Sequence, residues 1–360
     1  MDITAIATAD GNAYALGGIF QNACHADVRL LASLRIPYAC AFSLPWLRIF
    51  MARIVVVGSI NMDMVTLAAR FPAPGETLMA ESFHTIPGGK GANQAVAAAR
   101  LGAEVSLIGA LGNDAFGQQL RQGLADEGVD IEHVQNLDDC ASGSASITVA
   151  QGDNHILVVP GANAHVMPEH VERAKGLIKR ADAVLVQMEI PLVTVEATVR
   201  LAHRLGVPVI LNPAPAQPLP TDWLKLVRYV TPNQHELAIL LDANTIEDFQ
   251  ALMQRAPCPV VLTCGEEGAW YRENGTPVHQ PGFPVDVVDT TGAGDTFNAA
   301  LAVFLRDGLP VAVKKACAAA ALAVSRFGAQ RGMPRLGEVE AMLEQPTSGK
   351  QDSGMPHPTA

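Results

Sequence analysis

The sequence lacks the features that would connect it to a nucleic acid, a membrane or an oxidising compartment. Its formal net charge is −11 and it contains no long run of Lys or Arg, so we expect neither a nucleic acid nor a membrane as partner. The six cysteines show no CxxC or other ligand spacing, which favours reduced thiols in the cytoplasm over disulfides or a zinc site. Near the N-terminus, Arg35 and Arg48 bracket only twelve uncharged residues, too few for the roughly 20 that a membrane helix needs.

The chain does have enough apolar material for a large folded core. It contains 360 residues, of which 49% are hydrophobic and 17% are charged. This composition is typical of a globular protein, and the length fits one large domain or two ordinary ones.

The two ends of the chain differ from the part between them. Residues 1–50 carry an acid at Asp2, where a secretory signal would have basic residues, and Met51 opens a fresh strand-like run, "MARIVVVGSI". We therefore expect residues 1–50 to be an extension outside the fold and residues 51–345 to be the folded domain. Residues 346–360 are polar and contain Pro and Gly, which predicts a disordered tail.

Short apolar runs rich in β-branched residues alternate with helical patterns along the domain. The runs are residues 53–60, 104–110, 183–189, 207–212 and 259–263. Their length and near-continuous hydrophobicity predict strands buried on both faces. The chain is therefore expected to form a doubly wound α/β fold, with a mostly parallel sheet and helices on both faces.

The intervening helices carry recognisable start and stop signals. Gly102 and Gly128 each follow a helical pattern, and Asp114 stands at an N-cap position. A further helix is predicted in "MPEHVERAKGLIKRA", which has acids early and bases late.

Two segments are strand-like but too polar for the central sheet: residues 62–88 and residues 143–163. In the second, Gly-Asp-Asn separates two alternating runs, which indicates a hairpin. We expect the two segments to form a small separate β-sheet that acts as a lid. Because the edges of such a lid are unpaired strands, pairing of two lids in a homodimer would protect them.

The stretch "DTTGAGDTF" predicts an anion-binding turn at the start of a helix. Glycines at Gly292 and Gly294, on either side of Ala293, let the backbone approach a phosphate, and the N–H groups of a helix N-terminus carry partial positive charge. Asp295 in the first turn would repel a phosphate, so it is better suited to take a proton from an attacking hydroxyl. The alternative is an ordinary N-capping Asp after a tight turn.

A second glycine-rich loop, in "PGGKGANQAVAAARLG", also leads into a helix, but it fits neither the P-loop nor the GxGxxG spacing. Lys90 and Asn93 in this loop, with Asn61 and Asp63 after the first strand, offer donors and acceptors suited to a polyol such as a sugar. Glu189 ends another strand, at the sheet edge where open α/β folds bind ligands. The alternatives are a polar turn for Asn61 and Asp63, and a solvated loop residue for Glu189.

The pair "GGKGANQA" and "DTTGAGDTF", about two hundred residues apart, resembles the two signatures of the PfkB carbohydrate kinase family, and within it the sequence is most similar to the ribokinases. The similarity runs from about Met51 to about Leu343 and includes "FPAPGET", "LNPAPA", "TPNQHE" and "SRFGAQ". It implies a ribokinase-like fold with a β-sheet lid. It also implies ATP-dependent phosphorylation of the terminal hydroxyl of a pentose, D-ribose to D-ribose 5-phosphate, by a cytoplasmic homodimer that pairs through the lid.

The resemblance assigns roles residue by residue. Asp295 matches the catalytic base, and Gly292, Ala293 and Gly294 match the anion hole. The positions that match sugar-binding segments are Asn61, Met62, Asp63, Gly89, Lys90, Gly91, Ala92, Asn93, Glu189 and Asp295.

The resemblance also implies sites for Mg-ATP and for a monovalent cation such as K⁺. The positions that match the ATP site, with Asn233 ordering the phosphates and Glu236 reaching Mg²⁺ through water, are Asn233, Glu236, Thr263, Cys264, Gly265, Glu266, Glu267, Gly268, Gly294, Asp295 and Cys317. From the residues alone, "TPNQHE" indicates an Asn cap that opens a helix, and "TCGEEG" a glycine-rich turn after a strand. The positions that match the cation site are Asp289, Thr291, Ala323, Arg326, Gly328 and Gly332.

Two positions depart from the family pattern. Gly332 stands where ribokinases often have a serine, which removes a side-chain oxygen from the cation site. Cys317 stands where a polar residue often lies near the adenine, which loosens nucleotide selectivity. Neither change affects Asp295.

Other functions fit parts of the sequence. A related kinase could act on deoxyribose, another pentose or a nucleoside, and the residues near the sugar 2-position would decide between them. A non-catalytic sugar-binding regulator could keep the fold, although such proteins usually lose the base or the anion-hole glycines. The glycine spacing argues against an NAD-dependent oxidoreductase.

Overall fold

The computed structural model describes residues 51–243 and 249–344. The predicted extension, residues 1–50, and the predicted tail, residues 346–360, lie outside the described residues. Within the described ranges no helix is both long and apolar enough to cross a membrane.

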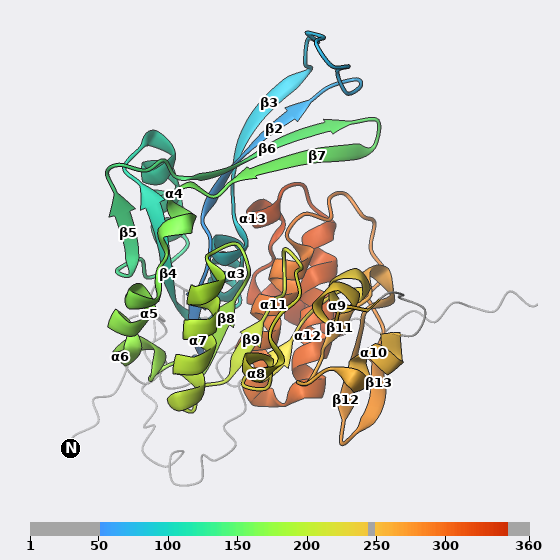
Figure 1. Cartoon of the computed structure of the whole chain (residues 1–360). Coiled ribbons are helices and arrows are strands. Elements are labelled where there is room, and N and C mark those ends of the chain that lie inside the picture. The colour runs from blue at the N-terminus through green and yellow to red at the C-terminus, as the bar shows by residue number, and fades with distance from the viewer. Residues whose placement is uncertain (1–50, 244–248, 345–360) are drawn as a thin grey trace, which may run out of the picture. The chain divides into compact units, whose positions relative to one another are not determined.

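The centre of the molecule is a six-stranded sheet in the order β10-β9-β8-β1-β4-β5, in which every neighbouring pair is parallel (Figure 1). The strands are β1 (Arg53–Val57), β4 (Glu104–Gly112), β5 (Val134–Leu137), β8 (Ala183–Val186), β9 (Val209–Leu211) and β10 (Tyr229–Val230). The predicted doubly wound, mostly parallel α/β fold is therefore confirmed.

Alternate residues of each strand enter different hydrophobic cores. In β1, Ile54 and Val56 join one cluster, and Val55 and Val57 join the other. Because both faces are covered, the inner strands are apolar at most positions, which is why they appear as nearly continuous hydrophobic runs.

Helices cover the two faces of the sheet. Those that contribute to the first cluster are α3 (Lys90–Arg100), α4 (Ala115–Asp126), α11 (Ala293–Phe304), α12 (Leu309–Val324) and α14 (Leu336–Glu344). Those that contribute to the second are α5 (Pro168–Arg173), α6 (Lys175–Ile178), α7 (Leu192–Arg204), α8 (Thr221–Leu224), α9 (Gln234–Leu240) and α10 (Phe249–Arg255). The helix predicted over "MPEHVERAKGLIKRA" is present as two short helices, α5 and α6.

The predicted helix boundaries agree with the structure. Asp114 caps α4, and its side chain accepts a 2.7 Å hydrogen bond from the Gly117 N–H. Gly102 and Gly128, just beyond α3 and α4, have φ values of 89° and 79°, which side chains disfavour.

The run at residues 259–263 is shared between two sheets rather than being a full central strand. Val260 forms a parallel bridge with Val230 of β10. Leu262 and Thr263 form β11, which pairs antiparallel with β12 (Ala269–Glu273), and β12 pairs with β13 (Thr276–Gln280). The run is too short to distinguish these two roles by its pattern.

A four-stranded mixed sheet, in the order β3-β2-β6-β7, projects from the body (Figure 1). Its strands are β2 (Asn61–Leu67), β3 (Ser82–Gly88), β6 (Gly143–Ala150) and β7 (Asp153–Val159). We call this sheet the lid. The predicted β6–β7 hairpin is confirmed, and its turn consists of Gln151 and Gly152, both with positive φ.

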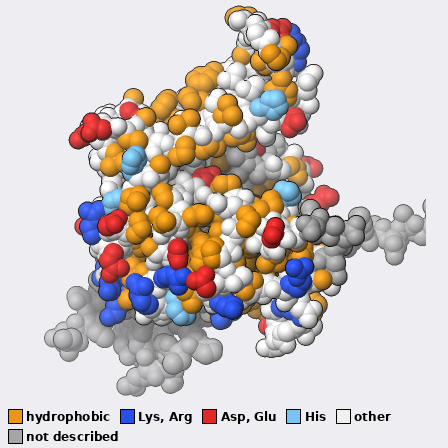
Figure 2. Space-filling model, viewed as in Figure 1, with side chains coloured by type: hydrophobic (Ala, Val, Ile, Leu, Met, Phe, Trp, Pro, Cys, Tyr) orange, Lys and Arg blue, Asp and Glu red, His pale blue; other side chains and the backbone are white. Residues whose placement is uncertain are grey.

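The segment after β7 differs from the expected lid. Residues 161–165 form a short 3-10 helix, η4 (Gly161–His165), and Ala162 is fully buried in the second core cluster. The lid strands therefore end at Val159. In the space-filling view the lid overhangs a hollow on the visible face of the body (Figure 2).

Candidate active site

The candidate site lies where the carboxyl ends of neighbouring parallel strands meet. β1 has β4 on one side and β8 on the other, and the chain reaches β8 only after completing β4 and β5. Such a change of direction leaves a crevice at the carboxyl edge of the sheet. Gly58 after β1 approaches α3 so closely that a Cβ added at Gly91 would lie 2.7 Å from the Gly58 Cα. The start of α3 is thus packed onto the end of β1.

Glu189 joins the end of β8 to the start of α3. One of its carboxylate oxygens accepts a 3.1 Å hydrogen bond from the Lys90 backbone N–H and a 2.6 Å bond from the Ser59 hydroxyl. Lys90 is the first residue of α3, so this carboxylate lies at the positive end of the helix. Glu189 lies in a loop, as the alternative expected, but it is half-buried and its carboxylate is bonded to protein groups rather than free in solvent.

The start of α11 exposes unpaired backbone donors. Gly292 is the N-cap residue with φ 78°, and a Cβ there would lie 3.0 Å from atoms of Ala329. The Ala293 N–H donates to the Thr290 carbonyl at 3.3 Å. In the described part of the chain, the N–H groups of Gly294 and Asp295 donate to no other group. A Cβ added at Gly294 would meet nothing within 4 Å, so an anion can approach these donors.

Asp295 is buried in the first turn of α11, with 7% of its surface exposed. Each oxygen of its carboxylate accepts one hydrogen bond, from Asn93 at 2.9 Å and from Gln94 at 3.0 Å. Burial raises the pKa of Asp295, and Lys90 and the two amide donors oppose this shift. Because Gly292 is the N-cap residue, the alternative that Asp295 is an N-capping residue is wrong.

Charged side chains surround Lys90. Burial lowers its pKa, but the carboxylates of Asp295, Glu189, Glu236 and Asp63 act in the opposite direction, and the net result is a raised pKa. Burial, followed by repulsion from Glu189 and Asp295, raises the pKa of Asp63 to about 6. Neither the Lys90 ammonium nor the Asp63 carboxylate forms a hydrogen bond or close ion pair with another described residue. Both groups are therefore available to bind hydroxyls.

The other predicted sugar-binding residues differ in how they face the site. Asn61 begins β2, so it does not lie in a polar turn, and it accepts a 2.7 Å hydrogen bond from Asn163. Met62 and Ala92 have side chains buried in the first core cluster, where they cannot contact a ligand. Gly89 has φ 86° and is the N-cap residue of α3.

The predicted ATP residues are brought together at α9 and β11. Asn233 caps α9 and forms a capping box with Glu236, at 2.8 and 2.9 Å, so the expected Asn cap is confirmed. Thr263 bridges to Asn233. Beyond Thr263, "CGEEG" forms the expected turn, a 3-10 helix η5 (Gly265–Glu267). Cys317 is buried in α12, and burial, with a smaller contribution from the Cys264 thiol, raises the pKa of Cys317 to about 12.

The predicted cation residues form two linked groups. The Asp289 carboxylate accepts hydrogen bonds from the N–H groups of Thr291, at 2.9 Å, and Gly328, at 2.8 Å. Gly332 ends the short helix α13 (Ala329–Gly332), and a Cβ added there would lie 2.7 Å from the Ala323 carbonyl oxygen and 3.4 Å from that of Arg326. Two backbone oxygens thus converge beside Gly332.

Sequence reasoning missed several buried polar residues of the site. Gln94 contacts Asp295, Gln187 contacts Gln94, and Asn212 accepts a hydrogen bond from Gln94. Gln187 and Asn212 directly follow β8 and β9, and Gln94 lies in an alanine-rich helix. A polar residue at the end of a buried strand was the available signal.

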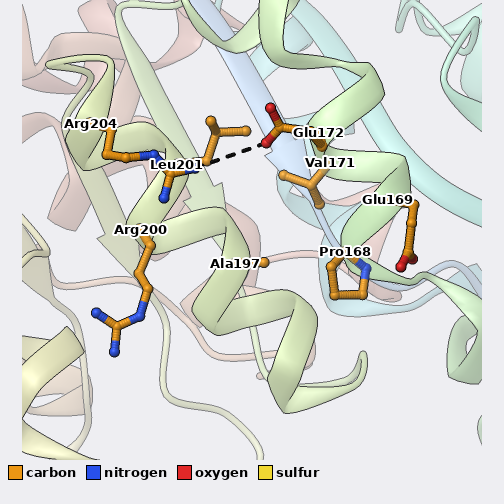
Figure 3. Close-up of a pocket in the computed structure, with 8 residues that line it drawn as sticks. All are labelled: Pro168, Glu169, Val171, Glu172, Ala197, Arg200, Leu201 and Arg204. Atoms are coloured by element: carbon orange, nitrogen blue, oxygen red, sulfur yellow. Dashed lines mark ion pairs between the residues drawn. The ribbon is translucent and has the colours of Figure 1, made fainter.

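A groove between α5 and α7, of about 320 Å³, lies apart from this site and contains none of its residues (Figure 3). The arginines that line it are already paired: Arg204 approaches Glu172 at 3.9 Å, and Arg200 bonds Glu196 and Asp222. The groove therefore offers no free cation to an anionic ligand.

Comparison with known proteins identifies the family of the chain. Residues 51–336 match the pfkB family carbohydrate kinase model. The chain belongs to the pfkB family of carbohydrate kinases.

Two relatives and one solved structure illustrate the similarity. The ribokinase of Bacillus subtilis (strain 168) is 45% identical over 295 residues, covering 81% of this chain and all of that protein. The deoxyribokinase of Salmonella typhi is 35% identical over 300 residues, covering 81% of this chain and 98% of that protein. The structure of Arabidopsis thaliana ribokinase complexed with ribose and ATP has a TM-score of 0.77 and 33% identity, and it covers 82% of this chain and 100% of that one.

The charge of Asp63 is expected to destabilise the fold near neutral pH. A pKa raised from 3.8 to about 6 means that the folded state holds a proton that the unfolded state releases. Stability from this group is full below pH 3.8 and is lost as the pH rises through 6. We therefore expect Asp63→Asn to raise the free energy of unfolding at pH 7.5 by up to about 3 kcal/mol, and at pH 4 by much less. Urea unfolding at both pH values measures this, and an equal effect at both would contradict it.

Proposed function

We propose that this chain transfers the terminal phosphoryl group of ATP to the terminal hydroxyl of D-ribose, giving D-ribose 5-phosphate. The observation that carries the proposal is the position of Asp295. Its carboxylate is held by Asn93 and Gln94 in the first turn of α11, beside the unpaired Gly294 N–H. We call the backbone of Gly292, Ala293 and Gly294 the anion cradle. A base next to such a cradle is the arrangement that phosphoryl transfer to a hydroxyl needs.

The roles of the surrounding residues follow from their chemistry. Asp63 and Lys90 bind the sugar hydroxyls, and Asp295 accepts the proton of the attacking hydroxyl. The N–H groups of the Gly292–Gly294 backbone stabilise the negative charge that develops on the transferred phosphoryl group. The lid covers the sugar and excludes water, which would otherwise compete as the acceptor.

ATP and Mg²⁺ fit the chemistry of the α9 end of the site. Mg²⁺ bound to phosphates usually keeps several waters and takes few carboxylates. Glu236 bonds the Asn233 N–H through one oxygen only, which leaves the other free for a metal-bound water. Mg²⁺ would neutralise the phosphate charge, and Asn233 would orient the phosphates.

A monovalent cation fits the loop beside the anion cradle. The carbonyl oxygens of Ala323 and Arg326 converge near Gly332, and carbonyl oxygens are ligands that K⁺ accepts. The Asp289 carboxylate accepts hydrogen bonds from the Gly328 N–H of this loop and from the Thr291 N–H just before Gly292, so a bound cation would stiffen the cradle. Since Gly332 provides no side-chain oxygen, we expect activation by K⁺ to be weaker than with serine at this position.

A coupled assay of ADP release with Mg-ATP tests the proposal. The acceptors are ribose, 2-deoxyribose, fructose, adenosine and pseudouridine, each with K⁺ and with Na⁺ as the control salt. We expect ribose to give the highest kcat/KM. A preference for deoxyribose would instead support the second candidate, a deoxyribokinase, which the Salmonella relative favours. No ADP release with any of the five acceptors would contradict the proposal.

We also propose that two chains pair through their lids. Every residue of the edge strand β7 is exposed, including four consecutive apolar residues from Ile156 to Val159, of which Leu157 is 73% exposed. Consecutive strand residues point to opposite faces, so both faces of this edge are apolar and unprotected. Partner strands would cover both the edge and this surface.

The lid dimer predicts a clear effect of one charge. We expect Leu157→Glu to convert a dimer into a monomer in light scattering at micromolar concentration, because it places an unpaired carboxylate in the interface. Val193→Glu is the matched control: Val193 is also exposed and apolar, but it lies on α7. A monomeric wild-type chain, or a dimeric Leu157→Glu variant, would contradict the lid interface.

A further inference from the structure

Two buried glutamine side chains form a line that ends at the Asp295 carboxylate, and a third buried amide, Asn212, branches from it. Gln187 donates to the side-chain oxygen of Gln94 at 2.6 Å. Gln94 then donates to Asp295 Oδ1 at 3.0 Å and to Asn212 Oδ1 at 3.2 Å. Both glutamines are fully buried, and they come from different elements: Gln94 from α3 and Gln187 from the end of β8. The line therefore connects the strand ends of the central sheet to the candidate base.

The line fixes which end of the Gln94 amide faces Asp295. The Gln94 oxygen is occupied by the Gln187 N–H donor, so its NH₂ group must point toward the carboxylate and Asn212. If the Gln94 amide were reversed, its oxygen would face the Asp295 carboxylate and its NH₂ group would face the NH₂ group of Gln187. Gln187 thus determines the orientation of Gln94 without touching Asp295.

Gln187 keeps this orientation at a cost. Its own oxygen is buried and has no hydrogen-bond partner among the described residues. The oxygen occupies space that only a glycine at residue 58 leaves open, since a Cβ there would lie 2.0 Å away. A buried oxygen without a partner destabilises the folded state, because it loses the hydrogen bonds that water would have provided. Such a defect needs a reason, and the orientation of the Gln94 donor provides one.

We propose that Gln94 and Gln187 are positioning residues for the phosphoryl transfer, and that they hold the Asp295 carboxylate ionised and in one orientation. A donor aimed at a carboxylate favours its charged form. This inference rests on the proposed role of Asp295 as the base.

Other charged groups also face Asp295, and they affect its ionisation together with the Gln94 donor. Lys90 on α3 favours the ionised carboxylate. Glu189 beyond β8, Asp63 on β2 and Glu236 on α9 disfavour it. Burial acts in the same direction as these acids and raises the pKa of Asp295. Loss of the Gln94 donor leaves Lys90 and Asn93 as the two groups that oppose that rise.

The pH dependence of kcat/KM for ribose, compared between the wild type, Gln94→Met and Gln187→Met, tests the inference. Methionine keeps the approximate shape but has no amide. We expect the acidic limb to move upward by about one pH unit in both variants. The activity at the wild-type midpoint should therefore fall about fivefold, and this loss should largely recover at high pH. Gln187→Met is the sharper variant because Gln187 does not touch Asp295.

Thr198→Val is the matched control, because it removes another buried hydrogen bond, from the Thr198 hydroxyl to the Thr194 carbonyl in α7, away from the site. It should leave the acidic limb in place. A uniform loss of kcat at all pH values in the glutamine variants, or an unmoved limb, would overturn the positioning role. An active wild type with an unmoved limb would refute this inference alone, whereas an inactive wild type would refute the proposed function with it.

Discussion

Replacement of Asp295 by asparagine is expected to lower kcat for ribose phosphorylation by about 10²- to 10⁴-fold, the usual scale for the loss of a general base. Asparagine has nearly the same shape but cannot accept the proton of the attacking hydroxyl. Since Asn233, Glu236 and Thr263 lie on other elements, ATP binding should persist. The coupled assay gives kcat, and isothermal titration calorimetry gives the affinity for ATP.

The same substitution should have little effect on stability, because two effects oppose each other. Burial makes the Asp295 charge unfavourable, so its removal stabilises the fold. The new amide NH₂ group, however, would face the amide donor of either Asn93 or Gln94 and lose one hydrogen bond. Asp307→Asn is the control and should keep full activity, because Asp307 is an exposed acid that pairs with Lys315 of α12. Turnover of Asp295→Asn within about threefold of the wild type would exclude Asp295 as the base.

The sequence was sufficient for four strands of the central sheet, β1, β4, β8 and β9, because burial on both faces leaves a local signal. The short edge strands β5 and β10 were not predicted. In β1 every residue after Arg53 is buried, so the strand is an unbroken apolar run. The run at 259–263 was harder to place, because it pairs with β10 on one side and begins an antiparallel sheet on the other. Pairing partners are determined by contacts between distant residues, and hydrophobic periodicity does not contain that information.

The candidate site was predictable where chemistry and backbone conformation coincide. Gly292 and Gly294 stood out because a loop into a helix rarely needs two glycines, and Asp295 stood out beside them. Gln94 did not stand out because it follows Asn93, to which the glycine-rich motif already gave a role. Gln187 did not stand out because a single amide after an apolar run has no characteristic spacing. Their contacts with each other and with Asp295 form only in the folded chain, where α3, the end of β8 and α11 come together.

Replacement of Gly294 by alanine is expected to give the second large loss, at least about 10²-fold in kcat/KM for ATP. A Cβ added at this residue would meet no neighbouring atom of the described residues within 4 Å, and the residue's own N–H is unpaired among them. We infer that the phosphate occupies the space beside Gly294, so a methyl group would hold it away from the N–H donors. Loss of one such donor typically costs about 10² to 10³ in kcat.

Stability should move in the opposite direction to activity. Gly294 lies within α11, where alanine is favoured over glycine by up to about 1 kcal/mol, and the added Cβ meets no neighbour. Gly123→Ala is the matched control, because Gly123 is also a helical glycine, in α4, whose Cβ would meet nothing within 4 Å. Both variants should unfold at equal or higher urea concentration than the wild type, but only Gly294→Ala should be inactive. If Gly294→Ala is stabilised and yet inactive, its loss of activity comes from the anion cradle, because damage to the fold would lower stability and activity together. Full activity in Gly294→Ala would contradict binding of the phosphate at this end of α11.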